Sequence, residues 1–161
     1  MPNYRDLVVY TDGACLGNGY HGAVGGVGVY FGPNDNRNYS GPLPGQIQTN
    51  QRAELEAIYQ ALVLIRDSLR FYRYQPSVII RTDSQYSINC VTKWSRRWRR
   101  HGWINSMGKP VTNADLVQEI LELMDTCGND IYFEYVPGHL DIPGNIAAHD
   151  LASAGARGHH Y

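Results

Sequence analysis

The 161-residue sequence lacks the features that mark membrane, secreted and disulfide-rich proteins. No apolar run approaches the roughly 20 residues of a membrane-spanning helix, and the first six residues lack the basic and apolar parts of a signal peptide. Cys15, Cys90 and Cys127 are odd in number and widely spaced, a pattern that fits neither a disulfide framework nor a zinc site. We therefore expect a protein of an intracellular, reducing compartment, the cytoplasm or the nucleus, that binds no membrane.

The sequence also lacks the high positive charge typical of nucleic-acid-binding proteins, since its formal net charge is −1. The distribution of charge points the other way. Residues 66–109 contain ten Lys and Arg against two Asp, whereas the rest of the chain contains four Lys and Arg against thirteen Asp and Glu. Because local potential decides where a phosphate backbone docks, residues 66–109 are a candidate binding region for a polyanion.

Hydrophobic residues are abundant enough for one compact domain over residues 1–161, at 43% of the chain, and charged residues make up 18%. Strands are expected at residues 7–10, 23–31, 78–82 and 131–136, with another after the turn at 33–36. Helices are expected at 51–69, 84–92, 113–127 and from 143 to about 154. This order predicts an α/β fold with a mixed sheet flanked by helices.

Three carboxylates are expected to converge at one edge of this sheet. Asp12 and Asp83 each follow a threonine at the end of a short apolar strand, and Glu54 lies on or beside the core-facing stripe of its helix. Hard divalent cations prefer oxygen ligands, so the cluster favours two Mg²⁺ or Mn²⁺ ions that could support phosphodiester hydrolysis. Each residue alone is equally well explained as a turn or surface residue, and only the joint pattern indicates a metal site.

Four segments resemble, in order and spacing, the motifs of the type 1 ribonuclease H family: YTDGAC at residues 10–15, TNQRAEL at 49–55, TDS at 82–84 and VPGH at 136–139. The resemblance extends from about residue 5 to residue 155. It implies the ribonuclease H-like fold, with a five-stranded mixed sheet in the order 3-2-1-4-5. It further implies an endonuclease that hydrolyses the RNA strand of RNA–DNA hybrids and leaves 5′-phosphate and 3′-hydroxyl ends. Asp12, Glu54 and Asp83 would hold two Mg²⁺ or Mn²⁺ ions.

A basic, tryptophan-rich segment at residues 93–103 resembles the family's basic protrusion, which grips the DNA strand. It carries five cations and three tryptophans. We expect Trp103 to pack on the core, Trp94 and Trp98 to share one face, and Arg97 and Arg100 to point away from that face. Cations beside aromatic rings are typical of nucleic-acid surfaces, although an amphipathic helix packed on a core has the same pattern.

The resemblance also assigns substrate contacts and one further catalytic residue. His139, on a loop between Gly138 and Pro143, matches the family's catalytic-loop histidine and would shuttle a proton or assist product release. The residues that would contact the DNA strand are Thr49, Tyr86, Trp94, Arg97, Trp98, Arg100, Ser106 and Asn113. Those that would contact the RNA 2′-hydroxyls are Gly13 through its backbone, Asn18, Asn50 and Gln51. Ile47 stands where the family often has an arginine, which predicts a weaker phosphate pocket.

The sequence departs from the family at the fourth metal-facing position. His149 occupies the position of the usual aspartate, and Asp150 follows it. One helical step is about 100°, so Asp150 would point elsewhere unless the helix start is shifted. Imidazole suits Mn²⁺ better than Mg²⁺, so His149 is a candidate catalytic residue and metal ligand whose presence could alter metal preference. A tolerated change without function is the alternative.

Two other functions remain open at this point. A catalytically weakened nucleic-acid-binding module on the same fold is compatible with His149, and an integrase or resolvase core shares the fold and the clustered carboxylates. Asn18, Asn50, Gln51 and the basic segment favour the hybrid-specific nuclease. We expect it to act as a monomer with an RNA–DNA hybrid as its partner.

Overall fold

The computed structural model describes residues 6–158 and contains one five-stranded sheet in the order β3-β2-β1-β4-β5. Its strands are β1 (Leu7–Leu16), β2 (Val24–Tyr30), β3 (Tyr39–Pro42), β4 (Val78–Thr82) and β5 (Ile131–Tyr135). The β1–β2 and β2–β3 pairs are antiparallel, and the β1–β4 and β4–β5 pairs are parallel. The predicted mixed sheet and its strand order are therefore confirmed.

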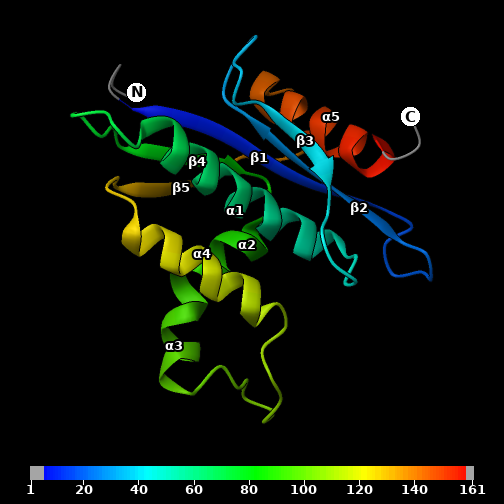
Figure 1. Ribbon diagram of the computed structural model, residues 1–161. Coiled ribbons are helices and arrows are strands. Elements are labelled where there is room, and N and C mark those ends of the chain that lie inside the picture. Colours follow the sequence, from blue (N-terminus) through cyan, green and yellow to red (C-terminus); the bar gives the residue numbers. More distant parts are fainter. Residues whose placement is uncertain (1–5, 159–161) are drawn as a thin grey trace.

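Helices cover both faces of this sheet (Figure 1). They are α1 (Asn50–Leu69), α2 (Gln85–Asn89), the π-helical segment η1 (Cys90–Trp94), α3 (Ser95–Arg100), α4 (Ala114–Thr126) and α5 (Pro143–Arg157). Helix α1 packs on β1 and β2 and also contacts α4, while α5 packs on β1, β2 and β3. None of the helices in the described part of the chain is long and apolar enough to cross a membrane.

The main hydrophobic core lies between the sheet and the helices α1 and α4. It contains Val9 of β1, Ile80 of β4, Leu55 and Ile58 of α1, and Ile120 of α4, all fully buried. Apolar residues three and four apart on α1 face this core, as the helical spacing predicted. Thr49 caps α1 because its side-chain oxygen accepts a hydrogen bond from the backbone N–H of Arg52.

Strand β1 is longer than the sequence predicted, and this changes the setting of Asp12. The prediction that Asp12 ends a strand is wrong, because β1 continues to Leu16 by pairing with β2, with Asp12 opposite Gly28. Pairing of β1 with β4 stops earlier, at Tyr10 opposite Arg81. Asp12 therefore lies inside a strand but just beyond the end of its parallel neighbour, at an opening in the sheet.

The helix expected at residues 84–92 extends much further. Ser84 caps its start, with its Oγ accepting a hydrogen bond from the backbone N–H of Ser87. The chain then continues through η1 and α3 to Arg100. In Figure 1, α3 and the loop that follows project away from the sheet beyond α4.

Asn113 precedes α4, but the expected side-chain cap does not form there. Its backbone is in the left-handed region at φ 61°, and its side chain makes no cap hydrogen bond. The side chain instead accepts a hydrogen bond from Arg52 and donates one to the hydroxyl of Tyr86. This arrangement ties the start of α4 to α1 and α2.

Candidate metal centre and nucleic-acid surface

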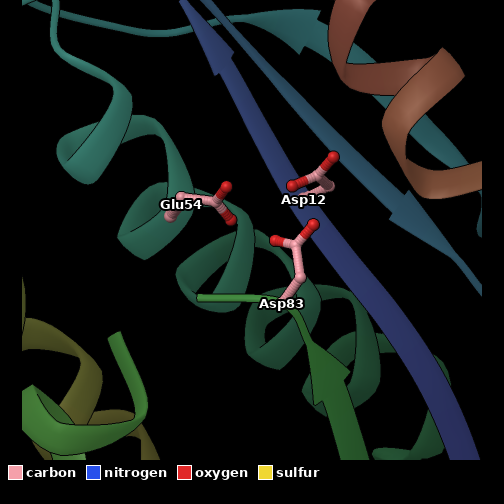
Figure 2. A group of neighbouring side chains, drawn as sticks. All are labelled: Asp12, Glu54 and Asp83. Carbon is pink, nitrogen blue, oxygen red and sulfur yellow. The ribbon is translucent and has the colours of Figure 1, made fainter. Parts of the chain in front are cut away.

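Three elements bring the predicted carboxylates together. Asp12 comes from β1, Glu54 from the second turn of α1 and Asp83 from the residue after β4. Each offers a carboxylate oxygen, and these oxygens all lie within 4.8 Å of one another. Figure 2 shows the three side chains pointing toward one another.

Two of the three carboxylates are largely removed from water, and the charges of the cluster repel one another. Asp12 and Glu54 are 2% and 6% exposed. Burial, and then the charge of Asp12, raise the pKa of Glu54 well above its ordinary value. The same two causes raise the pKa of Asp83 to about 6. Such a cluster gains stability from a cation that neutralises the repulsion.

Gly13 allows α1 to approach β1 closely enough to form this cluster. A Cβ on Gly13 would overlap the backbone of Ala53 and Glu54. The backbone N–H of Gly13 also donates a hydrogen bond to the Glu54 carboxylate. A side chain at this position would push Glu54 away from the aspartates.

Helix α5 adds two polar side chains to the site. The Nδ1 atom of His149 lies 3.0 Å from Oδ2 of Asp12. The side-chain amide of Asn145 hydrogen-bonds to Asp83, and this contact opposes the rise in the pKa of Asp83. Sequence reasoning had given Asn145 no role, although the Gly144-Asn145 pair at the start of the helix was the available signal.

His149, and not Asp150, faces the carboxylates. His149 lines the same open hollow as Asp12, Glu54 and Asp83, whereas Asp150 is exposed and is not among the residues that line it. The helix start is therefore not shifted in the way that would bring Asp150 into the site. Whether His149 binds a metal stays a prediction.

The donor set fits divalent cations. Oε2 of Glu54 is buried and has no hydrogen-bond partner, which is costly unless a cation or water meets it. Three converging carboxylates are the ligands that Mg²⁺ and Mn²⁺ accept. His149 lines the same hollow, and imidazole in general suits Mn²⁺ better than Mg²⁺.

The predicted contacts to RNA surround the same hollow. Gly13, Asn50 and Gln51 line it, and the last two are exposed. Oδ1 of Asn18 accepts a hydrogen bond of 3.0 Å from the backbone N–H of Asn50, so the β1–β2 turn is tied to the start of α1. His139 is exposed on its loop and is not among the lining residues. The loop itself lies against the site, because a Cβ on Gly138 would come within 2.7 Å of an Asp83 oxygen.

The predicted DNA-binding residues form a second surface beside the first. The rings of Tyr86, Trp94, Trp98 and Trp103 follow one another, with centroids 5.9 to 6.0 Å apart. Trp98 and Trp103 also pack against the core, which confirms the expectation for Trp103. Arg97 lines a hollow together with Trp94, Trp98 and Ser106, and the direction of its side chain relative to the tryptophan face stays a prediction. Arg100 is exposed and is not among the residues that line this hollow.

Thr49 and Asn113 are linked to each other through Arg52. Its backbone N–H binds Thr49, and its guanidinium binds Asn113 and forms an ion pair of 2.8 Å with Asp115. The Asp115 carboxylate accounts for most of the rise in the pKa of Arg52. Ile47 is 55% exposed nearby in sequence, so no charged group is supplied from that position.

Comparison with known proteins agrees with this geometry. A family model described as RNase H matches residues 4–157. Over 149 residues the chain is 44% identical to the ribonuclease H of Schizosaccharomyces pombe, covering 92% of this chain and 52% of that protein. Over 151 residues it is 36% identical to the ribonuclease H of Acidovorax sp. (strain JS42), covering 94% of this chain and 95% of that protein. The chain thus spans about half the length of the yeast protein and nearly all of the bacterial one.

Solved structures show the same fold. A crystal structure of LC9-RNase H1, described as a type 1 RNase H with the type 2 active-site motif, is similar with a TM-score of 0.73 and 28% identity. The similarity covers 95% of this chain and 72% of that one. A foamy viral protease-reverse transcriptase in complex with an RNA/DNA hybrid has a TM-score of 0.71 at 24% identity, over 92% of this chain and 20% of that one. The second likeness bears on the fold alone.

Proposed function

Because the chain belongs to the ribonuclease H family, we propose that it is an endonuclease that hydrolyses the RNA strand of RNA–DNA hybrids. The products would carry 5′-phosphate and 3′-hydroxyl ends. The observation that carries the proposal is the convergence of Asp12, Glu54 and Asp83 in an open hollow. The RNA-facing residues Asn50 and Gln51 line that same hollow.

Asp12, Glu54 and Asp83 are the residues that would hold two divalent ions, and His149 stands beside them where the family usually has a fourth carboxylate. Bound Mg²⁺ or Mn²⁺ supplies the positive charge that activates a water and stabilises the leaving oxygen. The side chains of Asn18, Asn50 and Gln51 and the backbone of Gly13 would hydrogen-bond the 2′-hydroxyls that distinguish RNA from DNA. His139, exposed on its loop, would move a proton at the leaving oxygen or assist product release.

The DNA strand would run along the second surface. Thr49, Ser106 and Asn113 would bind a phosphate, and Arg97 and Arg100 would add charge. Tyr86, Trp94 and Trp98 offer aromatic faces to the sugars or bases. Support comes from the position of Trp94, Arg97, Trp98 and Ser106 around one hollow. The chain would act as a monomer in a reducing compartment, where Cys15, Cys90 and Cys127 remain unpaired, as they are here.

One observation favours a second candidate, a catalytically weakened hybrid-binding module. His149 contacts Asp12 where a fourth carboxylate would otherwise add charge for metal binding. The nuclease is preferred because all three acidic residues are present and converge. In addition, Oε2 of Glu54 has no hydrogen-bond partner and is free to meet a cation.

The test is cleavage of a labelled RNA–DNA hybrid, duplex RNA and duplex DNA in parallel, each with Mg²⁺ or Mn²⁺. We expect cleavage of the hybrid alone and on its RNA strand alone. The Asp12→Asn variant should bind the hybrid but not cut it. Hybrid binding without cleavage by the unmodified chain would support the weakened module, and cleavage of duplex DNA would support an integrase-like or resolvase-like core.

A further inference from the structure

Helix α5 presents Asn145 and His149 to the carboxylate cluster from positions one helical turn apart. Residues at i and i+4 share a helix face, so the two side chains project toward the same side. Asn145 reaches Asp83, and His149 reaches Asp12 at 3.0 Å. Each aspartate of the cluster therefore has one hydrogen-bond partner on α5.

Close packing fixes where α5 places these two side chains. A Cβ on Gly144 would overlap the ring of Tyr10 on β1, and one on Gly28 of β2 would overlap the backbone oxygen of Ala148. The helix thus lies almost in backbone contact with β2 beside Asp12, and its first turn packs directly on the Tyr10 ring of β1. It has little freedom to slide or rotate without breaking this packing.

The direction of the hydrogen bonds follows from chemistry. An ionised carboxylate can only accept, so when Asp12 is ionised Nδ1 of His149 is the donor in this contact. The Asn145 amide likewise donates to Asp83 and is almost fully buried, at 4% exposed. Glu54 receives its own donor, the backbone N–H of Gly13. All three mutually repelling carboxylates are held in this way by a donor from a rigid part of the fold.

We propose that Asn145 and His149 are positioning residues that hold Asp83 and Asp12 in the orientation required to bind divalent ions. The proposal rests on the proposed function only in taking these carboxylates as the metal site. It assigns His149 a role through Asp12, and not one as a direct ligand. Hydrogen-bond partners of ligating groups typically account for 10- to 100-fold in metal affinity, so both residues should matter for binding.

Replacement by amides separates the two possible roles of His149. The amide nitrogen of asparagine lies near the place of the imidazole Nδ1, whereas that of glutamine lies near the place of Nε2. If His149 positions Asp12 through Nδ1, His149→Asn should preserve metal binding and His149→Gln should not. A direct ligand acting through Nε2 would give the opposite order.

The experiment is a titration of the chain with Mn²⁺ in the absence of nucleic acid, followed by electron paramagnetic resonance of the free ion. We expect His149→Ala, His149→Gln and Asn145→Ala each to weaken Mn²⁺ binding roughly tenfold. His149→Asn should remain within about threefold of the unmodified chain. The matched control is Ile146→Ala, on the same helix but 44% exposed, which should change nothing.

The proposal is overturned if His149→Gln binds like the unmodified chain while His149→Asn is weakened, or if neither alanine variant changes the affinity. Circular dichroism checks folding, and Asn145→Ser replaces Asn145→Ala if the latter does not fold. The His149 variants test the role of His149 even if no Asn145 variant folds. The His149 side chain is 61% exposed, so its replacement leaves no cavity and should not impair folding. The Mn²⁺ titration contains no nucleic acid, so its result bears on the positioning roles of Asn145 and His149 alone. The proposed nuclease function is tested separately, by cleavage of the hybrid.

Discussion

At the scale of single residues, the active groups are held in a state that costs stability. Asp83 is half-buried beside Asp12, and this environment raises its pKa to about 6. Desolvation and a neighbouring negative charge both disfavour the ionised form of a carboxylate, so ionising it costs stability. The free energy of unfolding of the metal-free chain should therefore fall as the pH rises and these carboxylates ionise.

We expect Asp83→Asn to stabilise the metal-free chain in a pH-dependent way. The folded-state pKa of Asp83 lies above its unfolded value of about 4, so the folded state binds the proton more tightly. The resulting stabilisation is complete below pH 4 and is lost as the pH rises through about 6. Asparagine cannot ionise, so the melting temperature of the variant minus that of the unmodified chain should grow from pH 4 to pH 7. A difference that stays constant over this range would contradict the prediction.

His149→Asp should lower the Mg²⁺ concentration that gives half-maximal hybrid cleavage, on the order of tenfold. The change replaces an imidazole partner of Asp12 with a fourth carboxylate, which suits Mg²⁺ better than imidazole does. The improvement with Mn²⁺ should be smaller. Asp150→Ala serves for comparison, because Asp150 does not line the hollow. An inactive Asp150→Ala variant beside an unchanged His149→Asp variant would reverse the assignment.

Sequence reasoning found the residues whose identity alone carries the chemistry. Asp12, Glu54 and Asp83 stand in recognisable motifs and do converge. Asn145 was missed because the Gly144-Asn145 pair marks the start of α5 but does not tell which side chain the asparagine meets. Its role depends on how α5 docks against β1, which no local pattern encodes.

At the scale of elements, α5 packs closely on β2 because glycines of β2 have no side chain to separate the two backbones. A Cβ on Gly26 would overlap the backbone of Ala152 and Ala156. This close packing places the polar residues of α5 beside the carboxylate cluster.

The types of the helices and strands were predictable from the periodicity of the sequence, but their lengths were not. Residues 13–16 show no alternation and become strand only by pairing with the glycine-rich β2.

Gly26→Ala should destabilise the chain by about 2 to 3 kcal/mol, because the added methyl group meets backbone atoms that cannot move aside singly. Urea unfolding measures the change. Gly158→Ala is the matched control, since a Cβ there would meet nothing within 4 Å. Equal stability of the two variants would show that α5 can shift to accommodate the methyl group.

At the scale of the whole molecule, the basic region seen in the sequence divides into two parts. Arg70 and Arg73 follow the end of α1, and Figure 1 shows this end well separated from α3. Residues 93–112 retain six Lys and Arg and no Asp or Glu. The sequence could not reveal this division. Strand β4 and helix α2 lie between the two basic parts in the chain, and the way these elements pack sets the distance between the parts. Only the part around α3 lies beside the aromatic rings and the candidate active site.

Changing Arg97 and Arg100 together to Ala should therefore weaken hybrid binding and reduce its salt dependence. Each phosphate contact contributes roughly 0.9 to the slope of log affinity against log salt on duplex DNA, so the slope should fall by up to about 2. Fluorescence anisotropy between low and moderate salt measures the slope, with Asp12→Asn in both chains to prevent cleavage. The double change of Arg70 and Arg73 to Ala removes the same net charge from the other basic part and should leave the slope unchanged. Equal effects of the two pairs would mean that overall charge, and not the surface beside Trp94 and Trp98, governs binding.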